Sequence, residues 1–304
     1  MTTRRSTAPH SCPAARPRPA LFRALGKQEP PERVEINGAT YYRARVLKHD
    51  SWAATAVYRG PAGRIVCKFN RKQPIFFFPM RWLGRMLARR EASFYVRLAD
   101  LGNVPSLVGD VCVDGERLAY AVAHDYVPGH PLGEREAVDE RFFSTLERLF
   151  AEMHRRHMAY VDAHKRENII VGDDGQPHLV DFQISFRLPG WWPANAWPAR
   201  VLLRMLQRSD SYHFEKHWAR CRPDLCGRDV REVVRRRPWW ISVHRLVAAP
   251  LRTLRRNLLV AIRIRTSGGQ AASEHFPEDV HTVRIEAERR SVPPRRASEV
   301  RKAA

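Results

Sequence analysis

The chain has few acidic residues for its size and very few lysines. Its 304 residues include 53 Lys and Arg against 32 Asp and Glu, a formal net charge of +21, and only 7 of the basic residues are lysine. This charge predicts either a solvated basic surface or a partner that carries phosphate, such as nucleic acid or an anionic membrane. The sequence also lacks any apolar run of about eighteen residues, the length that a membrane-spanning helix needs. A transmembrane anchor is therefore not expected.

Cysteine is scarce and scattered. The five cysteines are odd in number and form no CxxC pair, which argues against a disulfide framework and favours a reducing, cytoplasmic location. His213 and His217 have the spacing of neighbours on a helix, but no further Cys, His or carboxylate completes a ligand set, so no structural metal site is expected there. With 44% hydrophobic residues, the chain can bury the core of one large or two small domains.

Composition divides the chain into four parts. Residues 1–32 contain much Pro, Ala and Arg and predict a disordered basic arm. Residues 33–227 have the apolar periodicity of a folded domain, and residues 228–265 are rich in Arg and Trp. Residues 266–304 combine Gly, Ser, Pro and mixed charge with few apolar residues, which predicts a disordered tail.

Within the folded part, a strand-rich half precedes a helical half. Antiparallel strands are predicted over 40–47, 54–58 and 64–69, and two more over 106–113 and 117–123, joined by the turn dipeptide Asp114-Gly115. Apolar residues at helical spacing predict helices over 80–101 and 140–158, and the chain is mainly helical from residue 188. The expected fold class is therefore α+β, a five-stranded sheet with one inserted helix followed by a helical half.

The most informative segment runs from Tyr160 to Gln183. It contains Asp162 and Asn168 in a loop, and then a tight hairpin that ends at Asp181. The hairpin returns Asp181 to the sheet end that Asn168 occupies, so the three polar side chains are expected to lie close together. Hard oxygen ligands for a metal, beside a free carboxylate that can accept a hydroxyl proton, are what binding a magnesium nucleotide requires.

In this order of residues the chain resembles the protein-kinase-like superfamily, over roughly residues 33–225. The resemblance implies that Asp162 is the catalytic base and that Asn168 and Asp181 are ligands of Mg²⁺. It also implies that Lys68, at the end of Ile65-Val66-Cys67-Lys68, binds the α- and β-phosphates of ATP, and that Glu91 in the following helix is its ion-pair partner. Each of these residues alone would be an ordinary strand, helix or turn residue, and it is their joint occurrence that carries the resemblance.

Other site residues follow from the same resemblance. The basic residue of the catalytic loop is His164 or Lys165, with Lys165 assigned to the catalytic group. The hinge that holds adenine through backbone hydrogen bonds falls at Asp125 and Tyr126. The loop that covers the phosphates spans residues 48–55 and has no glycine, so Ala53 and Ala54 are expected to give the close backbone approach.

The chain departs from typical protein kinases in ways that indicate a branch. Tyr160-Val161 replaces the usual His-Arg before the base, Gln183 stands where Gly usually follows Asp-Phe, and no Ala-Pro-Glu triplet follows. In these features the chain resembles the bacterial lipopolysaccharide core kinases, which phosphorylate sugars of a membrane glycolipid. Many related chains are described as serine/threonine kinases.

The resemblance therefore implies a bilobal fold with a small lobe over about 33–123, a hinge over 124–132 and a large lobe over 133–227. The implied activity is transfer of the γ-phosphoryl group of ATP, with Mg²⁺, to a hydroxyl group. A glycolipid sugar is the favoured acceptor and a protein Ser or Thr the alternative. A membrane-associated pseudokinase that serves as a scaffold is an alternative of a different class.

The stretch over residues 239–265 predicts an amphipathic helix with an entirely basic polar face, which includes Arg252, Arg255 and Arg256. Such a helix either docks on the helical half or binds an anionic membrane surface. Nucleic acid is disfavoured as a partner, because no base-reading motif accompanies the arginines. The expected location is the cytoplasm, with a peripheral position on the inner face of the membrane if the helix binds lipid.

Overall fold

The computed structural model describes residues 19–75 and 77–243, together with Leu246, Pro250, Thr253 and Asn257. All helices and strands named below belong to one compact unit, Ala20–Thr253. The second unit combines Met1–Pro19 with Leu254–Ala304 and lies outside the described residues except for Pro19 and Asn257. The predicted tail over 266–304 is thus not described, nor is most of the predicted basic helix over 239–265.

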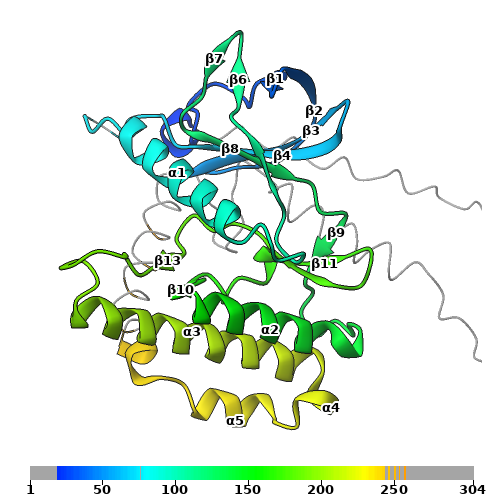
Figure 1. Ribbon diagram of the computed structural model, residues 1–304, viewed down its shortest axis with the longest axis vertical. Coiled ribbons are helices and arrows are strands. Elements are labelled where there is room, and N and C mark those ends of the chain that lie inside the picture. Colours follow the sequence, from blue (N-terminus) through cyan, green and yellow to red (C-terminus); the bar gives the residue numbers. More distant parts are fainter. Residues whose placement is uncertain are drawn as a thin grey trace, which may run out of the picture. The chain divides into compact units, whose positions relative to one another are not determined.

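The fold is α+β, and its largest element is a curled antiparallel sheet of eight strands (Figure 1). In spatial order the strands are β5 (Leu107–Gly109), β8 (Ala121–Asp125), β4 (Gly63–Asn70), β3 (Ala53–Gly60), β2 (Ala39–His49), β1 (Arg33–Ile36), β6 (Cys112–Val113) and β7 (Glu116–Arg117). Helix α1 (Arg81–Arg97) follows β4 and packs against β4 and β8. The central strands are thereby buried on both faces, as the burial of β4 from Ile65 to Asn70 shows.

Three details of the predicted sheet are wrong. The strand predicted over 117–123 is divided into β7 and β8, which are not neighbours in the sheet. The strand predicted over 106–113 is divided into β5, at one edge of the sheet, and β6, next to the strand at the other edge. The division falls at Gly109, whose φ of 153° lies in a region that other residues rarely adopt. Strand β1 was not predicted, although Asn37-Gly38, with φ values of 52° and 78°, forms the tight turn that joins it to β2.

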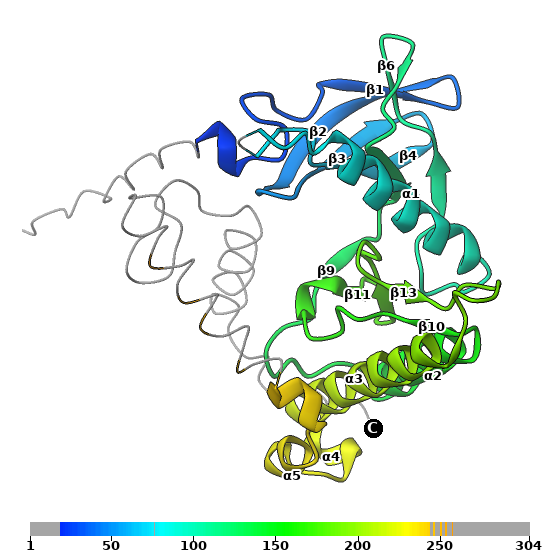
Figure 2. The same cartoon turned by 90° about the vertical axis from the view of Figure 1, so that its left-hand side faces the viewer.

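The rest of the unit is mainly helical, with short strands placed between the large sheet and the helices (Figures 1 and 2). Its helices are α2 (Glu140–Arg155), α3 (Trp197–Cys221), α4 (Pro223–Cys226) and α5 (Val230–Arg235). Its strands form the sheet β12 (Pro177–Leu179), β11 (Ile169–Gly172), β9 (Gly129–Pro131) and the pair β10 (Met158–Ala159), β13 (Phe186–Arg187). Two 3-10 turns, η1 (Ala20–Phe22) and η2 (Arg166–Asn168), complete the elements.

Helix α2 begins where the sequence predicts and presents an apolar stripe to the core. Asp139 caps it by accepting a 2.8 Å hydrogen bond from Arg141 N. Its buried stripe from Phe142 to Met153 packs in one cluster with Phe94 of α1 and with the β11–β12 hairpin. Helix α1 therefore packs on the large sheet and also joins the core of the helical half, and this double contact fixes the position of its side chains.

The second part of the predicted disordered arm is instead ordered and packed. Leu25 belongs to the core cluster of the large sheet, and Ala24 N donates to Asp50 O at 2.7 Å. The buried Arg71 guanidinium donates to backbone carbonyls of Leu21 and Ser51. The prediction of disorder over 1–32 is therefore wrong from residue 20 onward, because few but well-placed apolar and hydrogen-bonding groups anchor this segment.

The beginning of the predicted Arg/Trp-rich extension packs against α3. Val233 of α5 is buried with Tyr212 and Ala219, and Ile241 packs against the same cluster. Trp239 is 70% exposed. The apolar stripe and basic face predicted further along lie outside the described residues. In the part of the chain that the structure describes, no helix combines the length and apolar character needed to cross a membrane.

Candidate functional site

Lys68, Glu91 and Asp181 form a buried network of charges. Lys68 lies in the middle of the sheet, where Thr55 of β3 and Val122 of β8 pair with it on either side. Its Nζ donates to Glu91 Oε1 at 3.2 Å and to Asp181 Oδ1 at 2.6 Å. The side chains of Lys68 and Glu91 are 8% and 1% exposed, whereas Asp181 retains 31% exposure. The structure thus brings together three of the predicted site residues, one from β4, one from α1 and one from the segment after β12.

The electrostatics keep two members of this network, Lys68 and Asp181, charged at neutral pH. Burial opposes the charge of Lys68, but the carboxylates of Asp181 and Glu91 outweigh it and raise the pKa of this lysine. Burial would also raise the pKa of Asp181, but Lys68, followed by Lys165 and Lys48, holds it below its usual value. For Glu91 burial dominates the attraction of Lys68 and raises the pKa to about 7. Asp181 is therefore the firmly ionised partner of Lys68.

A second cluster surrounds the predicted base, Asp162. Its Oδ2 accepts hydrogen bonds from Lys165 Nζ at 2.7 Å and from Asn168 Nδ2 at 3.1 Å. Its Oδ1 lies 3.3 Å from His164 Nδ1. The Asp162 side chain is 3% exposed, while those of Lys165 and His164 are about half exposed. Both basic residues considered for this loop therefore contact the same carboxylate, Lys165 more closely than His164.

Asp210 of α3 holds the backbone of this loop, and the sequence analysis did not identify it. The fully buried Asp210 carboxylate accepts hydrogen bonds from Tyr160 N at 2.7 Å and from Val161 N at 2.8 Å. Val161 has φ of 70°, a left-handed conformation that is unfavourable for a β-branched residue. His154 Nε2 approaches the same carboxylate at 3.3 Å. Asp210 thus supports a strained backbone immediately before Asp162.

The β11–β12 hairpin places Asp181 as the sequence predicts. Ile169 pairs with Leu179, and Val180 N donates to Asn168 O at 3.1 Å. Asp181 follows this pairing with φ of 63°, so the chain turns sharply there and directs the carboxylate to Lys68.

The residues after Asp181 fix the turn. Phe182 is fully buried against Phe94, Tyr95 and Tyr160. Gln183 Nε2 donates to Asn70 Oδ1 at 2.9 Å. This hydrogen bond ties the segment to the end of β4, and it is a contact that glycine at position 183 could not make.

The glycine-free loop between β2 and β3 is closed by its own aspartate. Asp50 Oδ1 accepts hydrogen bonds from Trp52 N at 2.7 Å and from Ala53 N at 2.9 Å, which is the pattern of an Asx turn. Ala53 and Ala54 lie in β3 and are buried, and the amide of Ala53 is already used. Lys48, near the end of β2, has its Nζ 3.2 Å from Asp50 Oδ2, and its charge contributes to the lowered pKa of Asp181. Lys48 was not among the predicted site residues, although it is one of only seven lysines.

The predicted hinge residues use their amides within the protein. Asp125 N donates to Ser106 O at 3.0 Å and Tyr126 N donates to Arg64 O at 3.3 Å. The Arg64 guanidinium also stacks on the Tyr126 ring, 4.3 Å from its centroid. The Asp125 carbonyl oxygen is also used, because it lies 2.8 Å from His124 Nδ1 and accepts a hydrogen bond from that ring.

Asn168 and Asp181 offer the donor atoms that Mg²⁺ prefers. Asn168 uses its Nδ2 toward Asp162, which leaves its amide oxygen for another partner, and Asp181 uses one carboxylate oxygen toward Lys68. Among the described residues there is no group of three or more His, Cys, Asp or Glu side chains placed to hold a metal ion. A pair of oxygen ligands fits Mg²⁺, which keeps several waters and takes its other ligands from substrate phosphates.

Comparison with protein-family models found no match for the chain, and comparison with curated proteins found no significant relative.

Proposed function

We propose that the protein is an ATP-dependent phosphotransferase with a bilobal, protein-kinase-like fold. In this proposal the large sheet with α1 is the small lobe, residues 124–132 are the hinge, and the helical half is the large lobe. The observation that carries the proposal is Lys68 Nζ, placed 2.6 Å from Asp181 Oδ1 and 3.2 Å from Glu91 Oε1. A buried lysine held between two carboxylates, one of which is itself a candidate metal ligand, suits the positioning of a nucleoside triphosphate.

Each residue of the site has a separate role in this proposal. Lys68 would bind the α- and β-phosphates and Glu91 would orient it. Asn168 and Asp181 would hold Mg²⁺, which supplies charge neutralisation on the phosphates. Asp162 would orient the acceptor hydroxyl and receive its proton as the acceptor oxygen bonds to the γ-phosphorus, while the bond from the γ-phosphorus to the bridging oxygen breaks and ADP leaves.

The favoured acceptor is the sugar hydroxyl of a glycolipid. Where a peptide-docking segment would follow Asp181, the chain instead places Trp191 and Trp192, which are 65% and 80% exposed. Large aromatic side chains exposed in this segment suit an amphiphilic substrate better than a soluble peptide. Transfer to a protein Ser or Thr is the alternative outcome of the test.

The test uses labelled ATP and two variants. Asp162→Asn should lower phosphoryl transfer by at least about 100-fold, the usual contribution of a general base, with nucleotide binding nearly unchanged. Asp181→Asn should instead remove the part of ATP binding that depends on Mg²⁺, measured by thermal shift with and without the metal. Wild-type turnover in both variants would contradict the assignment, and nucleotide binding without transfer to any acceptor would favour the pseudokinase.

The acceptor is identified by the fraction that takes up label. Purified protein is incubated with γ-labelled ATP and a cell extract divided into lipid, protein and small-molecule fractions, with Asp162→Asn as the background control. Label in the lipid fraction supports the glycolipid acceptor, and label confined to protein supports the serine/threonine alternative.

A further inference from the structure

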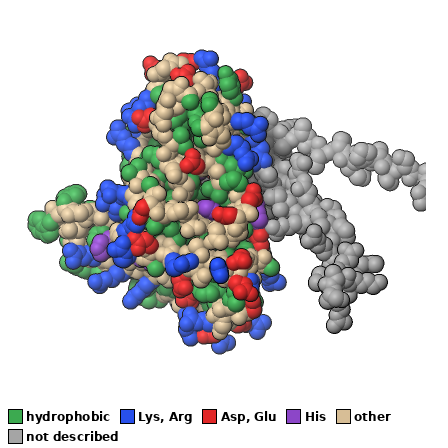
Figure 3. All heavy atoms as spheres, turned by 45° about the vertical axis from the view of Figure 1, so that its right-hand side comes forward, with side chains coloured by type: hydrophobic (Ala, Val, Ile, Leu, Met, Phe, Trp, Pro, Cys, Tyr) green, Lys and Arg blue, Asp and Glu red, His purple; other side chains and the backbone are tan. Residues whose placement is uncertain are grey.

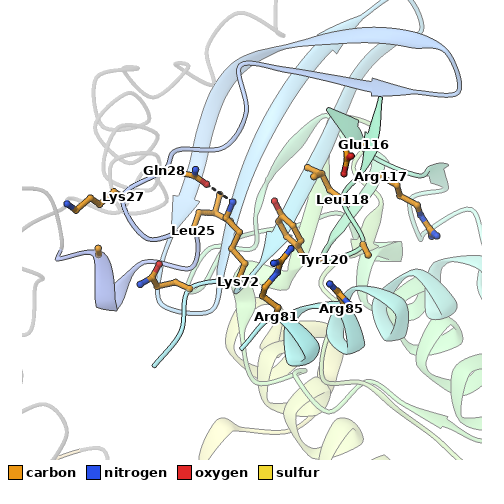
Figure 4. Close-up of a pocket in the computed structure, with 13 residues that line it drawn as sticks. Leu25, Lys27, Gln28, Lys72, Arg81, Arg85, Glu116, Arg117, Leu118 and Tyr120 are labelled. Atoms are coloured by element: carbon orange, nitrogen blue, oxygen red, sulfur yellow. Dashed lines mark hydrogen bonds between the residues drawn. The ribbon is translucent and has the colours of Figure 1, made fainter. Parts of the chain in front are cut away.

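A basic pocket opens beside the start of α1, separate from the residues of the candidate site. Its cavity of about 660 Å³ is lined by the segment around residues 25–28, the segment after β4, the first turns of α1 and the β7–β8 connection (Figure 4). Five basic residues and one acidic residue, Glu116, contribute to the lining. Basic side chains are also widespread elsewhere on the surface (Figure 3), so the charge alone does not distinguish this place.

The arrangement of the charges does distinguish it. Lys72 and Arg81 converge on the Tyr120 ring (Figure 4), with Lys72 Nζ 5.6 Å from the ring centroid. Burial, with the nearby charge of Arg81, lowers the pKa of Lys72. Within the part of the chain that the structure describes, Arg81 and Arg85 take part in no ion pair or side-chain hydrogen bond. An anion in this pocket would offset the repulsion between these cations.

The backbone beside the pocket is closely packed. Arg71 is buried and its guanidinium holds carbonyls of Ser51 and Leu21. Helix α1 approaches so closely that a Cβ on Gly84 would lie 2.3 Å from Arg71 O. The helix also begins without a capping side chain and without an acidic residue in its first turn, so its partial positive charge adds to that of the pocket.

Large apolar side chains stand exposed next to these cations. Phe77 and Phe78, in the loop before α1, are 99% and 75% exposed, and Trp82 and Met86 are 61% and 46% exposed on the first turns of the helix. Residues 71–90 contain six basic residues and no acidic one. Aromatic side chains beside arginines are typical of segments that lie at a membrane–water interface.

We propose that this region binds the surface of an anionic phospholipid membrane. Its members, named here the α1 docking surface, are Lys72, Phe77, Phe78, Arg81, Trp82 and Arg85. The pocket accepts a headgroup phosphate, and the aromatic side chains enter the interface. A soluble anion would satisfy the pocket but leave the exposed aromatics in water, which is why the membrane is favoured. The proposal is independent of phosphoryl transfer.

The test is co-sedimentation of the full chain with vesicles. Vesicles of equal parts phosphatidylglycerol and phosphatidylcholine should bind the protein, and vesicles of phosphatidylcholine alone should bind it weakly. Arg81→Gln with Arg85→Gln should weaken binding about 30-fold, since each basic residue near an anionic surface raises the affinity roughly fivefold. Phe77→Ser with Phe78→Ser should weaken it too, and this loss should be as large at high salt as at low salt, because salt does not screen the apolar contribution.

Matched controls separate this surface from the general charge of the protein. Arg141→Gln with Arg148→Gln removes the same charge from an exposed part of α2 and should leave binding nearly unchanged. Replacing Arg252, Arg255 and Arg256 with Gln tests the predicted basic helix, and the docking surface should still bind in that variant. Asp162→Asn should bind vesicles as the wild type does, so a failed phosphotransferase assignment would not affect this result.

Several outcomes would overturn the proposal. The Arg81/Arg85 and Arg141/Arg148 variants could lose vesicle binding equally, both variants of the α1 docking surface could bind as the wild type does, or binding could be lost only in the variant of the basic helix. A last experiment uses inorganic phosphate in place of vesicles. If phosphate raises the melting temperature of the wild type but not of the Arg81/Arg85 variant, and vesicles do not bind, the pocket takes a soluble anion and the membrane proposal fails.

Discussion

Lys68 contacts two carboxylates that reach it from distant parts of the chain, and this makes its replacement informative. In Lys68→Met the buried Glu91 loses its partner, and an unpaired buried charge is strongly destabilising. Because burial already raises the pKa of Glu91 to about 7, protonation of Glu91 relieves part of this effect. We expect the free energy of unfolding to fall by about 2 kcal/mol and phosphoryl transfer to fall at least about 100-fold.

A double variant separates the stability of this network from its function. Lys68→Met combined with Glu91→Gln removes both charges, so urea unfolding should show part of the lost stability restored, whereas phosphoryl transfer should stay low. Recovery of transfer in the double variant would show that Lys68 acts only as a structural partner of Glu91.

Asp210 offers a second prediction at the level of a single residue. In Asp210→Asn one amide oxygen remains for Tyr160 N or Val161 N, but the new NH₂ group faces the other donor. The left-handed backbone at Val161 then loses support and Asp162 is less well held. We expect kcat to fall about 100-fold while KM for ATP changes little, since misplacing a catalytic group affects the chemical step. A proportional rise in KM would contradict a positioning role.

The resemblance predicted the lysine, the two carboxylates and the pairing of Lys68 with Glu91, because these residues occur in order and each has a distinctive chemical type. It did not predict the contact between Lys68 and Asp181. Asp210 was not predicted because its sequence neighbours, Ser209 and Ser211, make it resemble a residue on a solvated helix face. Its partners are backbone amides far away in the chain, and a sequence does not show which backbone amides will need a hydrogen-bond acceptor. The roles of Asp162, Asn168 and Asp181 stay predictions until activity is measured.

At the scale of elements, α1 depends on a glycine. In a helix interior, replacing glycine with alanine normally stabilises by about 1 kcal/mol. At Gly84 the new Cβ would lie 2.3 Å from Arg71 O, a backbone atom that cannot easily move. We therefore expect Gly84→Ala to lower the melting temperature and, by shifting the helix that carries Glu91, to lower phosphoryl transfer. Gly102→Ala is the control, because no atom lies within 4 Å of its added Cβ; equal effects of the two changes would contradict this reading.

The elements themselves were predicted with uneven success, for physical reasons. The helices α1 and α2 and the strands β2, β3 and β4 follow strong apolar periodicity, and the sequence locates them to within a few residues. The strand predicted over 106–113 contains residues that suit a strand throughout, but Gly109 allows the chain to leave one end of the sheet and join the other. Periodicity reports local conformation and contains no information on which edge a strand will join.

At the scale of the whole molecule, histidines that are buried or partly buried predict sensitivity to acid. Burial lowers the pKa of His124 to about 4, that of His213 to about 3 and that of His217 to about 4. Unfolded histidine has a pKa of about 6.5, so between about pH 6.5 and 4 the unfolded state binds more protons than the folded state. Stability is then present above pH 6.5 and is lost as pH falls, by roughly 1 kcal/mol per pH unit for each histidine.

His217 allows this pH dependence to be assigned. Its Nε2 lies 2.9 Å from Ala163 O, so the ring donates there, and the amide of Gln could replace that hydrogen bond without a titrating group. In His217→Gln the free energy of unfolding, measured by urea at pH 7 and pH 5, should fall less steeply than in the wild type, by roughly 1 kcal/mol per pH unit. Glu91, whose pKa is raised, changes stability in the opposite direction, but it is common to both proteins and cancels in the difference.

His157→Asn is the control: His157 is exposed and has φ of 55°, a conformation that Asn tolerates, so this variant should keep the wild-type slope. An unchanged slope in His217→Gln would show that the imidazole is accessible to protons in the folded protein.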